Sequence, residues 1–299
     1  MSQSNGTLVI NIPHDATDPV AIVKKIVNGF IVDAPVSGLS VTIDVTATYK
    51  EAPVNGPSRF LGNVVIKDGA IKENNVHPLE TVPEYMAKIR QWATDRNIIG
   101  GGSTDLDQLI KGLTEAGEFW THIGKRQYPM LKDDIGDIIV CLVNSVGCLD
   151  INLEDYVTVL NENERVSAKA LYRAKGLKRF SLQVLYGLTN TARYIEQQAD
   201  YDAGEADSES EMHGFILADI AESAADVVYT LETVALEHGW TLAECLHEAY
   251  YDIWQRKGLM VQGTFVKESD FTREMVEAAL ADPSTKPTTR IYLTDWLNK

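Results

Sequence analysis

The chain contains an internal repeat that limits its fold more than any other feature of the sequence. Residues 112–119, GLTEAGEF, align without gaps to residues 187–194, GLTNTARY, and GDIIVCL at 136–142 aligns to ADVVYTL at 225–231. Repeated units of this kind bury their apolar faces against each other. The repeat therefore predicts two copies of a helical hairpin that close one shared bundle, as a fused pseudo-dimer.

The spacing within the two copies supports this interpretation. Leu153 follows Asp137 by 16 residues, and Leu242 follows Asp226 by the same 16 residues. The second hairpin holds 14 additional residues, which fall in the acidic stretch 200–213. Polar, acidic stretches are typical of solvated segments, so we expect 200–213 to form a loop.

The first 80 residues follow a different pattern, rich in β-branched residues and punctuated by Gly and Pro. Asp68 and Gly69 separate two short apolar runs and predict a tight hairpin turn. The expected order is strand, helix, strand and hairpin, over residues 8–13, 19–30, 39–49 and 60–73. No catalytic motif occurs here, so we interpret this part as an α+β accessory or oligomerisation domain.

From about Pro83 onward the apolar residues recur with the 3.6-residue period of a helix. Helices are expected over 82–96, 106–126 and 131–149, and a fourth is expected to begin near residue 151. The core-facing residues of the second and third are predicted to be Leu106, Leu109, Leu113, Ala116, Trp120 and Ile123, and Leu131, Ile135, Ile138, Leu142 and Val146. The predicted fold is mainly α, with an α+β domain at 1–80, two repeats at 81–174 and 175–271, and a tail at 272–299.

The composition argues against several classes of function. Acidic residues number 43 against 27 Lys and Arg, a net charge of −16, which disfavours binding to nucleic acid or an anionic membrane. No apolar run approaches the roughly 18 residues of a membrane-spanning helix, and no signal peptide is evident, so we expect a cytosolic protein. Three cysteines without paired spacing indicate reduced thiols rather than a disulfide framework or a zinc site.

Two pairs of acidic residues stand on consecutive predicted helices of the first repeat. Glu115 and Glu118 are three positions apart, as are Asp134 and Asp137, so each pair projects from one face of its helix. Four carboxylates that converge in a partly buried site repel one another unless they are protonated or a cation neutralises them. Oxygen ligands favour Mg²⁺, with Mn²⁺ as a substitute. Solvated acids on an exposed helix face are the alternative interpretation.

The second repeat lacks this arrangement. Asn190 and Arg193 occupy the positions of Glu115 and Glu118, and the remaining acids, Glu222 and Asp226, are four residues apart. We expect these two to be ordinary surface charges. One metal site per chain is therefore predicted.

The run IRQWATDRNIIGGGSTDLDQLIKGLTEAGEF, followed by LKDDIGDIIVCLVNSVGCLDINLEDY, resembles the MazG-like all-α nucleoside triphosphate pyrophosphohydrolases of bacteriophages. Their signature, E-E-x-x-E followed by E-x-x-D, implies that Glu115, Glu118, Asp134 and Asp137 are the magnesium ligands. Thr114 stands where the family has its leading Glu, and Asp134 replaces a Glu. The stretch QRKGLMVQGTFVKESDF resembles the family's tail, so the resemblance covers about residues 85–271.

The resemblance implies hydrolysis of a nucleoside triphosphate to a monophosphate and pyrophosphate, in the host cytoplasm if the chain is phage-encoded, by a homodimer. Glu115 or Glu118 is the expected proton acceptor. Candidate substrate contacts are the cations and polar residues near the acids, each of which also fits an ordinary structural role: Lys111, His122, Lys125, Arg126, Asn144, Asn161, Arg256, Lys257 and Lys267. Two alternatives remain, a nucleotide-sequestering regulatory protein without turnover and a pure assembly protein.

Overall fold

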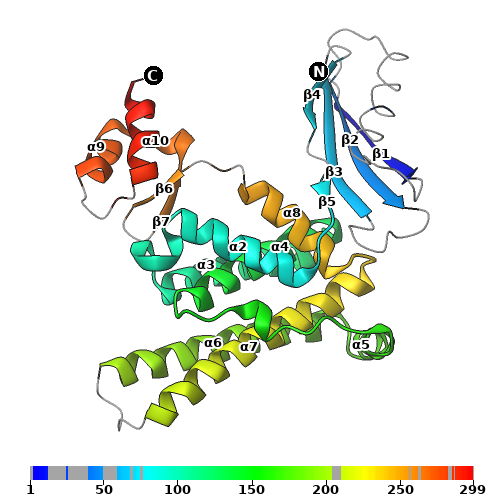
Figure 1. Cartoon of the computed structure of the whole chain (residues 1–299). Helices are drawn as coiled ribbons and strands as arrows, with labels where there is room; N and C mark the ends of the chain where they lie inside the picture. Colours follow the sequence, from blue (N-terminus) through cyan, green and yellow to red (C-terminus); the bar gives the residue numbers. More distant parts are fainter. Residues whose placement is uncertain are drawn as a thin grey trace. The chain divides into compact units, whose positions relative to one another are not determined.

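A computed structural model of the chain divides into two compact units, residues 1–81 and 82–299 (Figure 1). The division falls within the proline-containing segment 74–83. The described residues are 3–12, 25, 40–49, 59–67, 70–74, 77–203, 210–254, 256, 258–261, 264–281, 285 and 287–298.

The first unit contains a sheet whose strands follow the order β1-β2-β3-β4, with β5 paired to β3. β1 and β2 are parallel, and the other pairs are antiparallel. The predicted strands are therefore confirmed. The predicted hairpin is formed by β3 and β4, which end and begin on either side of residues 68–69. The predicted helix 19–30 lies outside the described residues, apart from Lys25, which is helical. The strands are β1 Gln3–Ile12, β2 Ser40–Tyr49, β3 Arg59–Lys67, β4 Ala70–Asn74 and β5 His77–Pro78.

The second unit is mainly α-helical, as predicted, and the first three predicted helices are confirmed within two residues of their bounds. A short antiparallel strand pair and two helices follow the bundle. The elements are α2 Val82–Asp95, α3 Asp105–Lys125, α4 Leu131–Gly147, α5 Glu162–Lys175, α6 Leu177–Asp202, α7 Ser210–Glu237, α8 Leu242–Trp254, β6 Gly258–Val261, β7 Thr264–Lys267, α9 Arg273–Ala281 and α10 Pro287–Leu297.

The two repeats form two helical hairpins that pack against each other. α3 packs against α4, and α6 packs against α7 (Figure 1). The equivalent helices also meet, because α3 contacts α6 and α4 contacts α7. The segment after each hairpin crosses to the other copy, so that α8 packs on α4 and α5 packs on α7. The second repeat thereby contributes a helix to the surroundings of the first.

The core-facing stripe of α4 is confirmed, since all five predicted residues, from Leu131 to Val146, are buried. The stripe predicted for α3 is partly wrong. Leu109 and Ala116 are buried, but Leu106 is 45% and Leu113 36% exposed. The buried stripe of α3 instead runs through Leu109, Gly112, Ala116 and Phe119. Hydropathy does not mark Gly112, although its missing side chain lets α3 approach Cys141 of α4 closely.

Two other expectations are also corrected. The fourth helix does not begin near residue 151: a single 3₁₀ turn spans Leu153–Asp155, and α5 begins only at Glu162. The backbone N–H of Leu160 donates to the Glu232 carboxylate at 3.3 Å, a contact that a helical Leu160 would lose to its own helix. The acidic stretch 200–213 is not a simple loop, because its ends extend α6 to Asp202 and begin α7 at Ser210; residues 204–209 lie outside the described residues.

Gly136 permits the close approach of α8 to α4. A Cβ atom at position 136 would lie 2.6 Å from the Cβ of Ala249 and 2.7 Å from the carbonyl oxygen of Cys245. Because the second of these is backbone, it cannot move aside cheaply. Gly117 differs, since no described atom lies within 4 Å of the corresponding position.

Gly136→Ala is therefore expected to lower the free energy of unfolding by about 1–3 kcal/mol through overpacking. Gly117→Ala, the matched control, is expected to raise it by up to about 1 kcal/mol through helix propensity. Urea unfolding followed by circular dichroism measures both. Equal stability of Gly136→Ala and the wild type would contradict the packing of α8 on α4.

Candidate functional site

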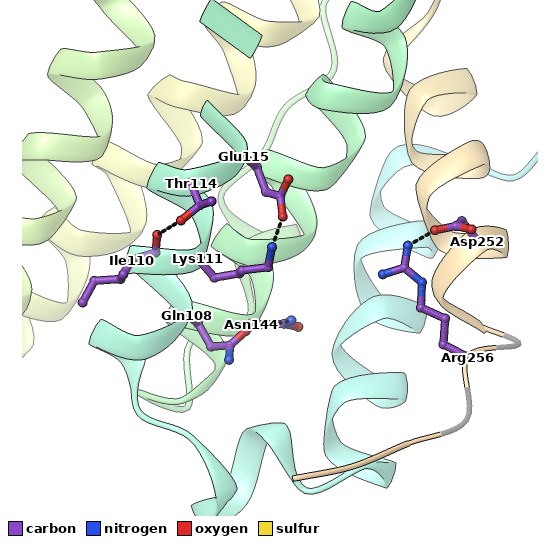
Figure 2. Close-up of polar contacts among 8 residues, drawn as sticks. All are labelled: Gln108, Ile110, Lys111, Thr114, Glu115, Asn144, Asp252 and Arg256. Atoms are coloured by element: carbon purple, nitrogen blue, oxygen red, sulfur yellow. Dashed lines mark hydrogen bonds and ion pairs between the residues drawn. The ribbon is translucent and has the colours of Figure 1, made fainter. Parts of the chain in front are cut away.

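Polar side chains face each other along the α3–α4 hairpin. On α3, Gln108, Lys111 and Glu115 follow one another at helical spacing (Figure 2). On α4, Asn144 lies opposite Gln108, and its Nδ2 donates to the Gln108 Oε1 at 3.3 Å. Asp137, two turns before Asn144, lies near Glu115, since the Glu115 charge acts on it. The hairpin therefore places Glu115 close enough for its charge to act on Asp137.

Asp137 has the most perturbed carboxyl of this region. Burial, followed by the negative charges of Asp133 and Glu115, raises the pKa of Asp137 to about 7, and the positive charge of Arg256 opposes this rise. An anionic Asp137 is therefore costly in this setting. A bound cation would lower that cost.

The acids of α4 also face acids of α8. Burial raises the pKa of Asp133, and the charges of Glu248 and Asp252 on α8 raise it further, while Arg256 lowers it. The charges of Glu115 on α3 and Asp252 on α8 thus both act on Asp133 and Asp137 of α4. We name these four residues the acid cluster.

Two acids of the cluster, Glu115 and Asp252, are each paired with a nearby base. Lys111 forms an ion pair with Glu115, and Arg256 forms one with Asp252 (Figure 2). Burial lowers the pKa of Lys111, but its hydrogen bond and ion pair with Glu115 raise the pKa more, so that the net shift is upward. Two cations thus border the acid cluster, and both were predicted candidates for phosphate binding.

The other two predicted ligands form a separate pair beside the cluster. Asp134 is 5% exposed, and its Oδ2 lies 2.8 Å from the His122 Nδ1. Burial raises the pKa of Asp134, the bond with His122 lowers it, and the charge of Glu118 raises it again. Glu118 itself is exposed. Within the described ranges, no three His, Cys, Asp or Glu side chains are arranged as ligands of one ion. The predicted ligands therefore form two neighbouring pairs rather than one convergent set.

The remaining predicted contacts lie in different settings. Lys125 and Arg126 are exposed at the end of α3. The Asn161 side chain accepts from the Glu164 backbone N–H and caps α5. Lys257 lies outside the described residues.

The second repeat contains no counterpart of the acid cluster among its described residues. Asn190, Arg193 and Asp226 are exposed. Ser223 occupies the position of Asp134, and its hydroxyl lies 2.9 Å from that of Thr191. Here a neutral hydroxyl pair replaces the buried carboxylate, so the two copies differ electrostatically at equivalent positions.

Sequence reasoning missed Asp133 and Asp252, whose charges act on Asp137, and Glu248, whose charge acts on Asp133. Asp133 stands four residues before Asp137, and Glu248 and Asp252 are also four apart on α8. The predicted pairs are three residues apart, whereas these pairs are four apart, so the prediction did not include them. A usable signal was present, since Glu222 and Asp226 repeat the spacing of Asp133 and Asp137 in the second copy.

Arg96 binds the end of α8, the helix that carries Asp252 of the acid cluster and that Arg256 follows. Its Nη2 donates to the carbonyl oxygens of Trp254 and Arg256, both at 3.1 Å. Its guanidinium lies over the Trp92 ring, 4.9 Å from the ring centroid. This arrangement fixes the last turn of α8 against α2.

Comparisons with known proteins give one partial relative. No family model matches the chain, and no solved structure matches it. An uncharacterized 18.2 kDa protein from the rep–hol intergenic region of Haemophilus phage HP1 is 38% identical over 60 residues, which are 20% of this chain and 36% of that protein. The chain thus spans about a third of that relative's length. Within the described part of the chain, no helix has the length and apolar character needed to cross a membrane.

Proposed function

We propose that the chain is a Mg²⁺-dependent nucleotide pyrophosphohydrolase with a tandem MazG-like fold, which cleaves a nucleoside triphosphate to the monophosphate and pyrophosphate. The observation that carries the proposal is the approach of Glu115, Asp137 and Asp252 from three helices, with Lys111 and Arg256 at their border. The partial similarity to a phage protein is compatible with it.

The oxygen donors of the cluster are of the chemical kind that a hard divalent cation binds. Such a cation would have to draw them together, because no three described side chains are arranged as its ligands. Carboxylate oxygens are the ligands that Mg²⁺ prefers, and the cluster holds more negative charge than its two cations neutralise. Glu115 and Asp137 are the proposed central ligands, with Glu118 and Asp134 beside them. When bound, Mg²⁺ would neutralise the triphosphate and lower the pKa of an attacking water. His122, whose Nδ1 lies 2.8 Å from the Asp134 Oδ2, is a further proposed contact to a phosphate.

The cations would bind phosphate oxygens at the border of the cluster. Both Lys111 and Arg256 are now paired with carboxylates, Glu115 and Asp252. A cation that binds these carboxylates would release the two basic groups toward the phosphates. Because Arg256 follows α8, the degenerate second repeat would complete the site of the first. Such a role would give the second repeat a function although it has no acid cluster of its own among the described residues.

A homodimer is part of the proposal. Leu106, Ile110 and Leu113 on α3 are exposed apolar residues at helical spacing, which supports such an interface. Light scattering on the full chain tests it.

One observation favours the second candidate, a protein that sequesters nucleotides without turnover. Three of the acids, Glu115, Asp134 and Asp252, are each paired with a basic side chain rather than turned to one common point. Binding requires less exact ligand geometry than catalysis does.

Pyrophosphate release, measured with malachite green and added pyrophosphatase, separates the two candidates. The screen covers dUTP, dCTP, purine triphosphates and guanosine alarmones with Mg²⁺ and Mn²⁺, for the wild type and Glu118→Gln. We expect one nucleotide class to be hydrolysed by the wild type and far more slowly by the variant. If the wild type releases no more than the variant on any nucleotide, the enzyme is excluded, and calorimetric binding of nucleotide then supports sequestration.

A further inference from the structure

Asn144 carries a buried hydrogen-bond acceptor that no described residue satisfies. The residue is 3% exposed, and its Oδ1 has no hydrogen-bond partner among the described atoms. Leaving such a group unpaired is unfavourable. A partner that binds from outside the chain would satisfy it.

The Asn144 amide belongs to a short series of hydrogen bonds. The Asn144 Nδ2 donates to the Gln108 Oε1 at 3.3 Å, and the Gln108 Nε2 donates to the Ser103 Oγ at 2.9 Å. In this arrangement the Asn144 Oδ1 accepts from neither residue. A hydrogen-bond donor is the partner that fits it.

The second repeat shows that the position does not require an unpaired acceptor. Thr233 is the counterpart of Asn144, and its hydroxyl donates to the Tyr229 carbonyl oxygen at 3.1 Å. The polar group is thus satisfied within its own helix in the second copy. At this pair of equivalent positions, the unpaired acceptor belongs to the copy that also carries the acid cluster.

The amide pair lies at a suitable distance from the acid cluster. Gln108 precedes Glu115 by seven residues, and Asn144 follows Asp137 by seven, so the pair stands two helical turns, about 10 Å, from these acids. This separation is comparable to the length of a nucleoside monophosphate. Lys111 lies between the two groups on the same face of α3, and Gln108 beside it is half-buried (Figure 2).

We propose that the Gln108–Asn144 pair recognises the nucleobase, with the Asn144 Oδ1 accepting an N–H of the hydrogen-bonding edge of the base. This inference rests on the proposed function for the placement of the phosphates at the acid cluster. It concerns binding only, so it also applies to a protein that sequesters nucleotides.

Titration calorimetry tests this with α,β-methylene analogues of ATP, GTP, CTP and UTP in Mg²⁺, with inorganic tripolyphosphate and ribose 5-phosphate as probes without a base. Asn144→Leu is expected to weaken binding of the analogue that the wild type binds most tightly at least tenfold. It should leave binding of tripolyphosphate and of ribose 5-phosphate unchanged. Gln108→Leu removes the hydrogen-bond partner of Asn144 at a less buried position. It is expected to weaken binding of the same analogue several-fold. Gln183→Leu, at the equivalent position of the second repeat, is the control and should have no effect.

The outcomes separate this inference from the proposed function. If the wild type binds an analogue and both Asn144→Leu and Gln108→Leu bind it equally well, base recognition is wrong and the proposed function stands. An equal loss of tripolyphosphate binding would assign the pair a structural role, and an equal loss of ribose 5-phosphate would assign it to the sugar; either result overturns the inference. If the wild type binds no nucleotide, both proposals fail. Thermal unfolding verifies that the variants are folded.

Discussion

Asp137→Asn is expected to reduce Mg²⁺-dependent nucleotide hydrolysis by roughly 100-fold or more, because metal-ion catalysis contributes several kcal/mol of transition-state stabilisation. The substitution removes one negative charge from the centre of the acid cluster and leaves the size of the side chain unchanged. Pyrophosphate release at saturating nucleotide gives kcat, and its dependence on Mg²⁺ gives the metal requirement.

Asp226→Asn is the matched control for this prediction. Asp226 occupies the equivalent position of the second repeat, where it is exposed and lacks the partners of Asp137. Its replacement is expected to change kcat by less than about twofold, as for a surface substitution. Similar losses in the two variants would show that the first repeat alone does not hold the active site.

The stability of the protein in EDTA is expected to fall as the pH rises from about 4 to about 7. Folding raises the pKa of Asp137 from 3.8 to about 7, so in this range the folded state binds more protons than the unfolded state does. Stability therefore decreases with pH, by at most about 4 kcal/mol for a shift of this size. Urea unfolding at pH 5 and pH 8 measures the difference, and added Mg²⁺ should stabilise the protein more at pH 8.

Asp137→Asn should remove most of this pH dependence, because the amide does not titrate. At pH 8 in EDTA the variant should be more stable than the wild type, although it loses activity. Asp226→Asn should retain the pH dependence. If the free energy of unfolding of Asp137→Asn changed between pH 5 and pH 8 as much as that of the wild type, the burial and crowding of this carboxyl would be contradicted.

Local sequence patterns were enough to predict the helices that carry the site. The apolar period placed α2, α3 and α4 within two residues of their observed bounds. The prediction was wrong where backbone packing decides the outcome. Gly112 lies in the buried stripe of α3 because it has no side chain, and Leu160 stays outside a helix while its N–H is bound by Glu232.

The candidate site was predicted only in part, again because packing between segments decides some of its contacts. The effect of the Glu115 charge on Asp137 follows from antiparallel packing of two consecutive helices, which the repeat indicated. The contribution of Asp252 and Arg256 depends on how α8 packs on α4, and Gly136 and Ala249 determine that contact. Such contacts between distant segments leave no local pattern. The orientation of Asp134 toward His122, rather than toward Asp137, was likewise not predictable from spacing.

Direct measurement of metal binding tests the central claim, that the acid cluster holds a divalent cation. Electron paramagnetic resonance of Mn²⁺ titrated into the full chain should reveal one site that Mg²⁺ displaces. Glu115→Gln and Asp137→Asn should each weaken this site at least tenfold, whereas Glu222→Gln and Asp226→Asn should leave it unchanged. Wild-type protein that binds no Mn²⁺, or a site unaffected by either substitution in the cluster, would contradict the account.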